Sequence, residues 1–271
     1  MIAESDLNDP RVITPRDALG LGFDTQWSDD FHHALHALLT GETAGYYVGY
    51  GKASDLARTI STGYLYTGQH SVYRGRKYGA RPNTRDGAKF VVFAQNHDQI
   101  GNRMLGERLA AIVSPAKLRL AAAAVILAPF LPMLFMGEEY GEIAPFQYFT
   151  SHSDEDLIEA VRRGRLEEFD DFDWHGEAPD PHAEETFQRS KLTRRGDDSL
   201  RQLYVDLLRL RRETPALRTL DLDDVEAHAD DERRTLVMRR GEVFVAFNFS
   251  EVEQTIESRV VPAEGFTIWS A

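Results

Sequence analysis

The sequence predicts an α/β protein in which a parallel sheet with helical crossovers is followed by a small antiparallel β region. Three observations indicate this fold. Short apolar strands alternate with helix-length segments as far as about residue 136, which is typical of a parallel sheet. Several of these strands end directly in carboxylates. From about Asp221 the pattern changes to successive strand-like runs without helices between them.

The N-terminal elements follow from short-range signals. Met1–Ala3 and Gly22–Trp27 are expected to be strands. Ser28 is expected to cap a helix whose apolar residues recur on one face and which ends before Gly41. A second short helix is expected over Lys52–Ile60.

The central elements surround one apolar run, Phe90–Phe93, whose aromatic and β-branched residues suit a strand buried on both faces. A long loop, Gly63–Gly87, precedes it and has the length of a binding loop or lid. Ser114 and Pro115 begin the next helix, which continues through Ala124. Pro132–Met136 is expected to be another buried strand.

The C-terminal half differs from the segments before it. Ala144–Asp173 is expected to be an aromatic-rich loop leading into a charged helix from about Asp154 to Phe169, and Asp198–Arg212 an amphipathic helix. The expected strands of the final region are Thr235–Met238, Val243–Phe249, Thr255–Ile256 and Phe266–Trp269. We expect two domains, residues 1–218 and 219–271, the second leaning on the first because so few strands are marginal alone.

Composition excludes several partners. The formal net charge of −13 argues against nucleic acid and anionic membranes, and favours a neutral or cationic ligand. The absence of cysteine excludes disulfides, thiolate metal sites and a cysteine nucleophile, and fits a reducing cytoplasm. No signal peptide is visible, and prolines interrupt the most apolar stretch, Leu120–Met136. The expected location is cytoplasmic.

Three strand ends carry a carboxylate: Glu4, Asp98 and Glu138. The carboxyl ends of parallel strands lie at one edge of the sheet, and the active sites of such folds are found there. We therefore expect the three carboxylates to share one acidic cleft. Asn96 and His97 precede Asp98. The simpler interpretation is that Asn96 and Asp98 only cap a turn and that His97 is structural, and Glu138 could equally be a hydrogen-bond anchor.

The remaining chemistry is that of carboxylates. No signature of serine, phosphate or dinucleotide chemistry is present. His32 and His36 are spaced by one helical turn, but they lack the context of a zinc site, so no metal and no cofactor is expected. Glycoside hydrolysis needs only one protonated carboxyl and one carboxylate on opposite sides of the sugar carbon.

Several motifs resemble those of one family. Residues 93–103, FAQNHDQIGNR, look like the strand-seven motif of α-amylase-type (β/α)8 glycoside hydrolases. Residues 2–10, IAESDLNDP, resemble the strand-five motif of one branch, the malto-oligosyltrehalose trehalohydrolases. The same branch is suggested by QWSDDFHH at 26–33, PMLFMGEE at 132–139, PFQYF at 145–149 and TFQRSKL at 186–192.

The resemblance implies roles for particular residues. Glu4 would be the general acid/base, which requires burial to raise its pKa, and Asp98 would strengthen contacts to sugar hydroxyls as positive charge develops. The other implied substrate-binding residues are His97, Asn96, Trp27, Asp29, His32, Phe146 and Tyr148. The implied substrate is malto-oligosyltrehalose or a related α-glucan, cleaved at the α-1,4 bond next to its terminal trehalose.

The chain also departs from the family pattern. The family's nucleophile is an aspartate on strand four, upstream of the strand-five motif, and no residue here can be assigned to it. We therefore expect the C-terminal half of a barrel, strands five to eight, followed by a curtailed β domain, with the N-terminal half as a partner. The isolated chain is expected to be inactive. Two alternatives stay open: another α-glucan enzyme, such as a branching enzyme, and a non-catalytic glucan-binding remnant.

Overall fold

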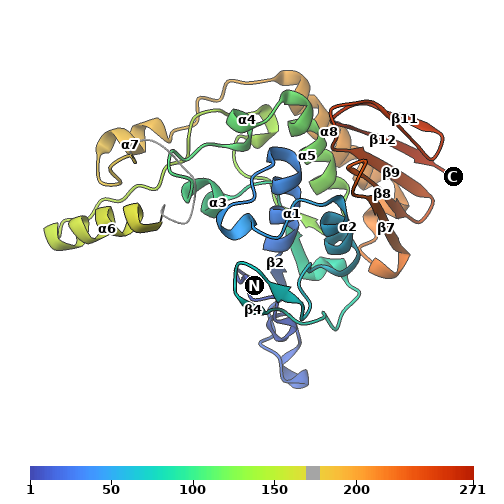
Figure 1. Cartoon of the computed structure of the whole chain (residues 1–271), viewed down its shortest axis with the longest axis horizontal. Coiled ribbons are helices and arrows are strands. Elements are labelled where there is room, and N and C mark those ends of the chain that lie inside the picture. Colours follow the sequence, from blue (N-terminus) through green and yellow to red (C-terminus); the bar gives the residue numbers. More distant parts are fainter. Residues whose placement is uncertain (169–177) are drawn as a thin grey trace. The chain divides into compact units, whose positions relative to one another are not determined.

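The computed structural model describes residues 1–168 and 178–271. These residues form two compact units, each continuous in space but not in sequence (Figure 1). Unit 1 comprises 1–94, 115–133 and 202–271, and unit 2 comprises 95–114 and 134–201. The expected domain boundary after residue 218 does not coincide with a boundary between these two units, because residues 202–271 all belong to unit 1.

Unit 1 contains a four-stranded parallel sheet in the order β1-β2-β5-β6, as expected from the alternation of strands and helices. Its strands are β1 (Ile2–Ala3), β2 (Thr25–Trp27), β5 (Phe90–Val92) and β6 (Leu131–Pro132). The register pairs Ala3 with Gln26, Trp27 with Val91, and Val92 with Pro132. All residues of β5 are buried, which confirms a strand covered on both faces.

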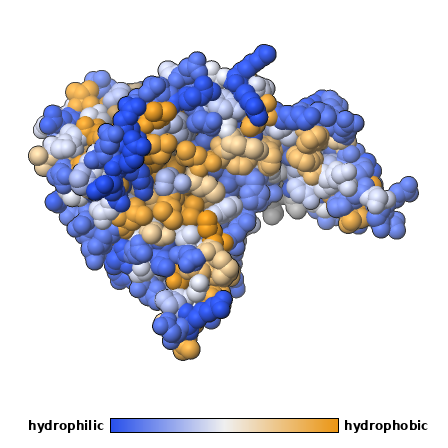
Figure 2. Space-filling view, turned by 180° about the vertical axis from the view of Figure 1, so that it is seen from behind, coloured by the Kyte–Doolittle hydropathy of each residue, from blue (hydrophilic) through white to orange (hydrophobic). Residues whose placement is uncertain are grey.

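The two outer strands carry apolar side chains that stay in contact with solvent. Within the described residues, β1 pairs only with β2 and β6 only with β5. Ile2 is 58% and Leu131 36% exposed. Figure 2 views the molecule from the side opposite to Figure 1 and shows apolar residues gathered over much of the visible surface. Unpaired strand edges of this kind are prone to pair with further strands.

Three helices of unit 1 pack together, and the first of them contacts β5. They are α1 (Asp29–Thr40), α2 (Ala53–Thr62) and α5 (Pro115–Leu127). Helix α1 ends at Gly41, whose φ of 80° is the left-handed conformation that glycine adopts without strain. Ser28 does occupy the N-cap position, but its hydroxyl donates to the Gly63 carbonyl at 2.9 Å, so the expected side-chain cap is wrong.

Some expected elements differ from those observed. The strand expected over Gly22–Trp27 covers only Thr25–Trp27. The strand expected over Pro132–Met136 stops at Pro132, because after the bond from Met133 N to Val92 O the next amides turn to local partners. Phe135 N, for example, donates to the Glu138 carboxylate at 3.1 Å. The loop Gly63–Gly87 contains an unexpected hairpin of β3 (His70–Ser71) and β4 (Arg76–Lys77).

The C-terminal region of unit 1 is an antiparallel sheet in the order β12-β9-β8-β7. Its strands are β7 (Val225–Asp230), β8 (Thr235–Arg240), β9 (Val243–Asn248) and β12 (Gly265–Ser270), with a separate hairpin of β10 (Gln254–Ile256) and β11 (Arg259–Val261). The predicted β8–β9 hairpin is confirmed, whereas β7 was not predicted as a strand. Helix α2 contacts β7 and α5 contacts β12, so this sheet does lean on the α/β part.

Unit 2 consists of short helices and long loops. Its helices are α3 (His97–Gly101), α4 (Leu109–Ile112), α6 (Glu155–Glu168) and α7 (Glu184–Arg189). The predicted charged helix is confirmed as α6, although its expected end at Phe169 and the expected loop end at Asp173 lie outside the described residues. Helix α8 (Asp198–Glu213) begins in unit 2 and continues into unit 1, where α9 (Pro215–Arg218) follows it.

Candidate functional site

Glu4 and Trp27 lie at the carboxyl edge of the parallel sheet in unit 1. Glu4 directly follows β1, and Trp27 is the last residue of β2, whose neighbour Gln26 pairs with Ala3. The Trp27 ring meets the Phe93 ring edge-on, with centroids 5.6 Å apart. Glu4 is exposed, so the described residues do not provide the burial that a general acid needs.

His32 lies on α1, the helix that follows β2 in the chain. Its side chain is buried, and its ring stacks on Phe93 with centroids 5.6 Å apart. Nδ1 lies 3.0 Å from the Ala94 carbonyl and therefore carries the proton, while Nε2 accepts from the Tyr47 hydroxyl at 3.2 Å. Burial, followed by repulsion from His36 and His33, holds the pKa of His32 well below its usual value. This neutral ring supports Phe93 and the end of β5.

Asp30, beside the predicted site residue Asp29, was missed by the sequence analysis. Asp29 is half-buried at the first position of α1. Asp30 is buried and accepts four hydrogen bonds, from Asn8 Nδ2, Leu65 N, Tyr66 N and the Tyr50 hydroxyl. Burial raises the pKa of Asp30, and these hydrogen bonds oppose the rise. A run of two aspartates in sequence gives no sign that one of them joins three loops.

In unit 2, Asn96, His97 and Asp98 form the start of α3. Asn96 is buried and caps the helix, because its Oδ1 accepts from Asp98 N at 2.9 Å and from Gln99 N at 3.1 Å. Its Nδ2 has no hydrogen-bond partner among the described residues. His97 and Asp98 are exposed, and Asp98 Oδ1 accepts from Asn102 Nδ2 at 2.8 Å. The cap therefore exists, and it presents the next two side chains to solvent.

Tyr148 and this helix share a contact with Arg165 of α6, which sequence reasoning did not single out. The Arg165 guanidinium lies 4.9 Å from the centroid of the Tyr148 ring. Its Nη2 donates to the Gly101 carbonyl at 2.7 Å, and its Nη1 to Asn102 Oδ1 at 3.4 Å. Since Asn102 also bonds Asp98, a chain of contacts joins Asp98 to Tyr148.

Phe146 is held more deeply, in a cluster around Arg108. Its ring lies edge-on to Phe135 with centroids 5.4 Å apart, and its amide donates to the Gly106 carbonyl at 2.8 Å. Arg108 is fully buried, lies 5.1 Å from the Phe135 ring centroid and donates to the carbonyls of Met136 and Ala144 at 2.7 Å. The arginine orders the loop that carries Phe146 and Tyr148.

The two glutamates that follow β6, Glu138 and Glu139, have local partners. Glu138 is buried and accepts from Phe135 N, which agrees with an anchoring role, and the half-buried Glu139 accepts from Gly137 N at 3.1 Å. Glu142, which was not predicted, accepts from the amides of Ala144 and Thr193 at 3.0 and 2.7 Å. Burial opposes these bonds, but together they lower the pKa of Glu142.

The candidate residues therefore form two groups. Unit 1 holds Glu4, Trp27, Asp29 and His32 around the ends of β1 and β2, and unit 2 holds Asn96, His97, Asp98, Phe146 and Tyr148. The expectation that Glu4 and Asp98 face one gap stays a prediction, because the two residues belong to different units. Within residues 1–168 and 178–271, no group of three His, Asp or Glu side chains is placed to hold a metal ion.

None of the described helices combines the length and apolar composition that a membrane crossing requires.

No protein-family model matches the chain. The chain is 46% identical over 259 residues to a malto-oligosyltrehalose trehalohydrolase of Rhizobium sp. (strain M-11), covering 93% of this chain and 44% of the relative. It is also 46% identical over 213 residues to the enzyme of that name from Saccharolobus solfataricus, covering 79% of this chain and 37% of the relative.

The fold has relatives among solved structures. A chain from Salmonella typhimurium provisionally assigned as an alpha amylase superposes with a TM-score of 0.84 at 29% identity, covering 98% of this chain and 50% of the other. An α-amylase from H. orenii superposes with a TM-score of 0.53 at 15% identity, covering 98% of this chain and 52% of the other, which shows a shared fold only. The chain thus spans about half or less of the proteins it matches.

Proposed function

Because this chain is similar over nearly its whole length to part of the malto-oligosyltrehalose trehalohydrolases, we propose that it forms part of such a glycoside hydrolase. The proposed reaction cleaves the α-1,4-glucosidic bond next to the terminal trehalose and releases trehalose. The observation that carries this proposal is the 46% identity over 259 residues. The parallel strands β1 and β5 support it, because each ends in the segment that the resemblance assigns to chemistry.

Glu4 is proposed as the general acid/base and Asp98 as the second carboxylate. Glu4 would protonate the leaving glycosidic oxygen and then activate water, and Asp98 would hold sugar hydroxyls as the oxocarbenium-like charge develops. Trp27, Phe146 and Tyr148 are proposed as walls for sugar rings. His32 would act through Phe93, which its ring supports. Asn96 orients Asp98 through its capping bond.

Catalysis by these residues is proposed to require the rest of a (β/α)8 barrel, which would also supply the nucleophile. Three observations support this. Within the described residues β1 and β6 each have one open edge, Ile2 and Leu131 on these strands are exposed, and Glu4 lacks the burial that an acid catalyst needs. Strands added at both edges would cover the apolar residues and enclose Glu4.

The test is reconstitution. The chain is expressed with the part of the Rhizobium sp. relative that it does not cover, and trehalose release from malto-oligosyltrehalose is measured by chromatography. We expect release from the pair and none from the chain alone. Release by the chain alone would contradict the need for a partner. New α-1,6 branches made from maltodextrin, with no trehalose, would instead indicate a branching enzyme.

Substitutions separate hydrolysis from binding. In the reconstituted protein, Glu4→Gln is expected to lower kcat by about 10²–10⁴, the usual contribution of a positioned acid/base, while substrate binding persists. Asp98→Asn is expected to lower kcat/KM strongly. Asp17→Asn, at another exposed acid of unit 1, is the matched control and should have no effect. Equal activity of Glu4→Gln and the control would remove Glu4 from the mechanism.

A further inference from the structure

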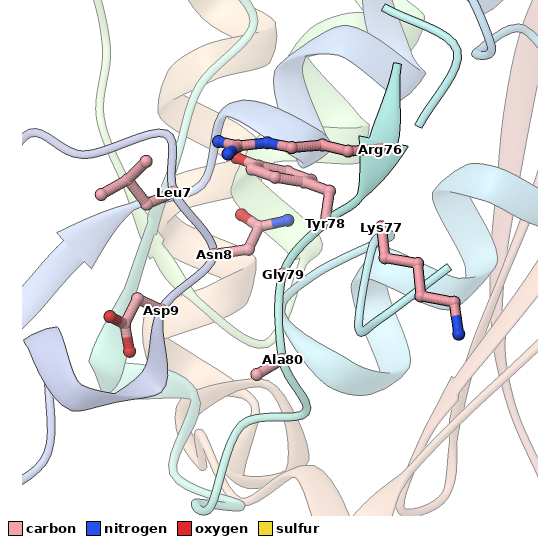
Figure 3. Close-up of a pocket in the computed structure, with 8 residues that line it drawn as sticks. All are labelled: Leu7, Asn8, Asp9, Arg76, Lys77, Tyr78, Gly79 and Ala80. Carbon is pink, nitrogen blue, oxygen red and sulfur yellow. The ribbon is translucent and has the colours of Figure 1, made fainter. Parts of the chain in front are cut away.

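Unit 1 contains a pocket of about 360 Å³ between the loop after β1 and the end of the β3–β4 hairpin. Leu7, Asn8 and Asp9 form one side, and residues 76–80 form the other (Figure 3). This volume falls within the range of roughly 300–1,000 Å³ of small-molecule sites. Four Cα–Cα steps separate Glu4 from Asn8, so the two residues are at most about 15 Å apart.

The pocket is built around Asn8, which is only 4% exposed. Its Nδ2 donates to Asp30 Oδ2 at 2.6 Å and to the Tyr66 carbonyl at 3.2 Å. Both partners are acceptors, so the orientation of the amide is fixed and both of its N–H groups are used. No described residue donates to Asn8 Oδ1, which remains available as an acceptor.

The opposite wall is held rigidly against Asn8. Ala80 N donates to the Asn8 carbonyl at 3.0 Å. Gly79 has a φ of +72°, and a Cβ there would lie 2.1 Å from the Tyr66 carbonyl oxygen. Only glycine allows the backbone to pass so close, so the wall stands in place before any ligand arrives.

Two further polar groups converge on the open side of Asn8. Figure 3 shows the Tyr78 hydroxyl and the Arg76 guanidinium directed toward the space between Leu7 and Asn8, whereas Lys77 points away. The Tyr78 ring is buried beneath the Arg74 guanidinium, 4.2 Å from its centroid, so the ring is fixed. Among the described residues Arg76 has no ion-pair partner, and Asp9 is engaged by Arg11 at 2.5 Å.

The donor and acceptor pattern selects the class of ligand. Asn8 Oδ1 requires a donor, Arg76 requires an acceptor, and the Tyr78 hydroxyl serves as either. A fully deprotonated anion such as sulfate cannot donate to Asn8, and a cation would face Arg76. Neighbouring hydroxyls of one sugar ring donate and accept together, and Leu7, which is 52% exposed, offers an apolar surface beside them.

We propose that this pocket binds one glucose unit of an α-glucan, separate from the residues that flank the cleaved bond. The inference rests on the proposed function, since it takes its ligand class from the same substrate. An oligosaccharide that occupies the pocket would be anchored within a few sugar units of Glu4, which would raise its affinity without taking part in bond cleavage.

The test is a titration of the chain with maltotriose, followed by ¹H–¹⁵N NMR, with the amides of Gly79 and Ala80 as reporters. Tyr78→Phe removes only the hydroxyl, and Arg76→Ala only an exposed side chain, so both variants should fold, as their spectra will show. Each is expected to weaken binding about three- to tenfold, the value of one hydrogen bond. Lys77→Ala, a cation on the same strand that points away, is the matched control.

The proposal is wrong if maltotriose does not saturate these amides, or if the control weakens binding as much as the two variants do. In the reconstituted hydrolase, Tyr78→Phe should raise KM three- to tenfold and leave kcat within twofold. Binding that depends on Tyr78 in a reconstituted protein without hydrolysis would refute the proposed function and leave this site standing. Binding lost in Glu4→Gln but kept in Tyr78→Phe would place the sugar elsewhere and refute the site.

Discussion

Replacing Arg240 by lysine should destabilise unit 1 by several kcal/mol, although the charge is kept. Arg240 lies on β8 and is 1% exposed. Its Nη1 donates to the carbonyls of Leu127 and Ala128 at 2.7 and 3.2 Å, and its Nη2 to those of Leu217 and Thr219. These contacts join the end of α5 and the end of α9 to the antiparallel sheet.

The magnitude follows from the hydrogen bonds that lysine cannot make. An ammonium group is compact, so it would reach at best two of the four carbonyls. Each bond from a charged donor contributes about 1.5–3 kcal/mol, so the loss is roughly 3–6 kcal/mol. The buried charge is retained, and burial, aided by repulsion from Arg211, already lowers the pKa of Arg240 to about 9. The substitution of lysine for Arg240 therefore loses hydrogen bonds without removing the cost of burying a charge.

The assay is urea unfolding followed by far-ultraviolet circular dichroism. Arg239→Lys is the matched control, because Arg239 precedes Arg240 on the same strand, is 47% exposed and pairs with Glu226 at the surface. Exposed pairs contribute about 0–1 kcal/mol, so the control should lie near the unsubstituted chain. If the two variants unfold within about 1 kcal/mol of each other, the four carbonyl contacts do not stabilise the fold as argued.

Further predictions concern buried polar groups. The pKa of His32 lies well below 6.5, and burial lowers that of His33 to about 3. The unfolded chain therefore binds more protons below pH 6.5, and stability should fall by about 2 kcal/mol between pH 7 and pH 5.5. His32→Phe should remove about half of this difference in urea midpoints, and an unchanged difference would contradict the assignment. Asp30→Ala removes the acceptor of four hydrogen bonds and should cost about 2–4 kcal/mol; a calorimetric midpoint within 1 °C of the parent would refute this.

The short-range signals of the sequence were sufficient for most helices and strands. Phe90–Phe93 was recognised as a buried strand, because a short run of aromatic and β-branched residues suits a strand that is covered on both faces. Gly41 marked the end of α1, because glycine adopts the left-handed conformation without cost. Motifs also identified the segments at the ends of β1 and β5, and the comparisons confirmed the resemblance to the malto-oligosyltrehalose trehalohydrolases.

Long-range partners were beyond such reasoning. Ser28 has the sequence signal of a cap, yet its hydroxyl donates to Gly63, 35 residues away. The predicted strand to Met136 stopped early, because Glu138 offers Phe135 an acceptor that competes with the sheet. Strand β7 alternates too weakly in hydrophobicity to be read alone, and it forms by pairing with β8.

The sequence by itself determined the alternation of elements, the absence of thiol chemistry and the identity of the carboxylates at the strand ends. Each of these depends on residue type and local spacing. Only the tertiary structure decided that Asn8, Asp30 and Tyr50 share one network, that Arg165 links Asp98 to Tyr148, and that Glu4 stays exposed. The physical reason is that burial and hydrogen-bond partners are properties of packing between distant segments, which no local pattern encodes.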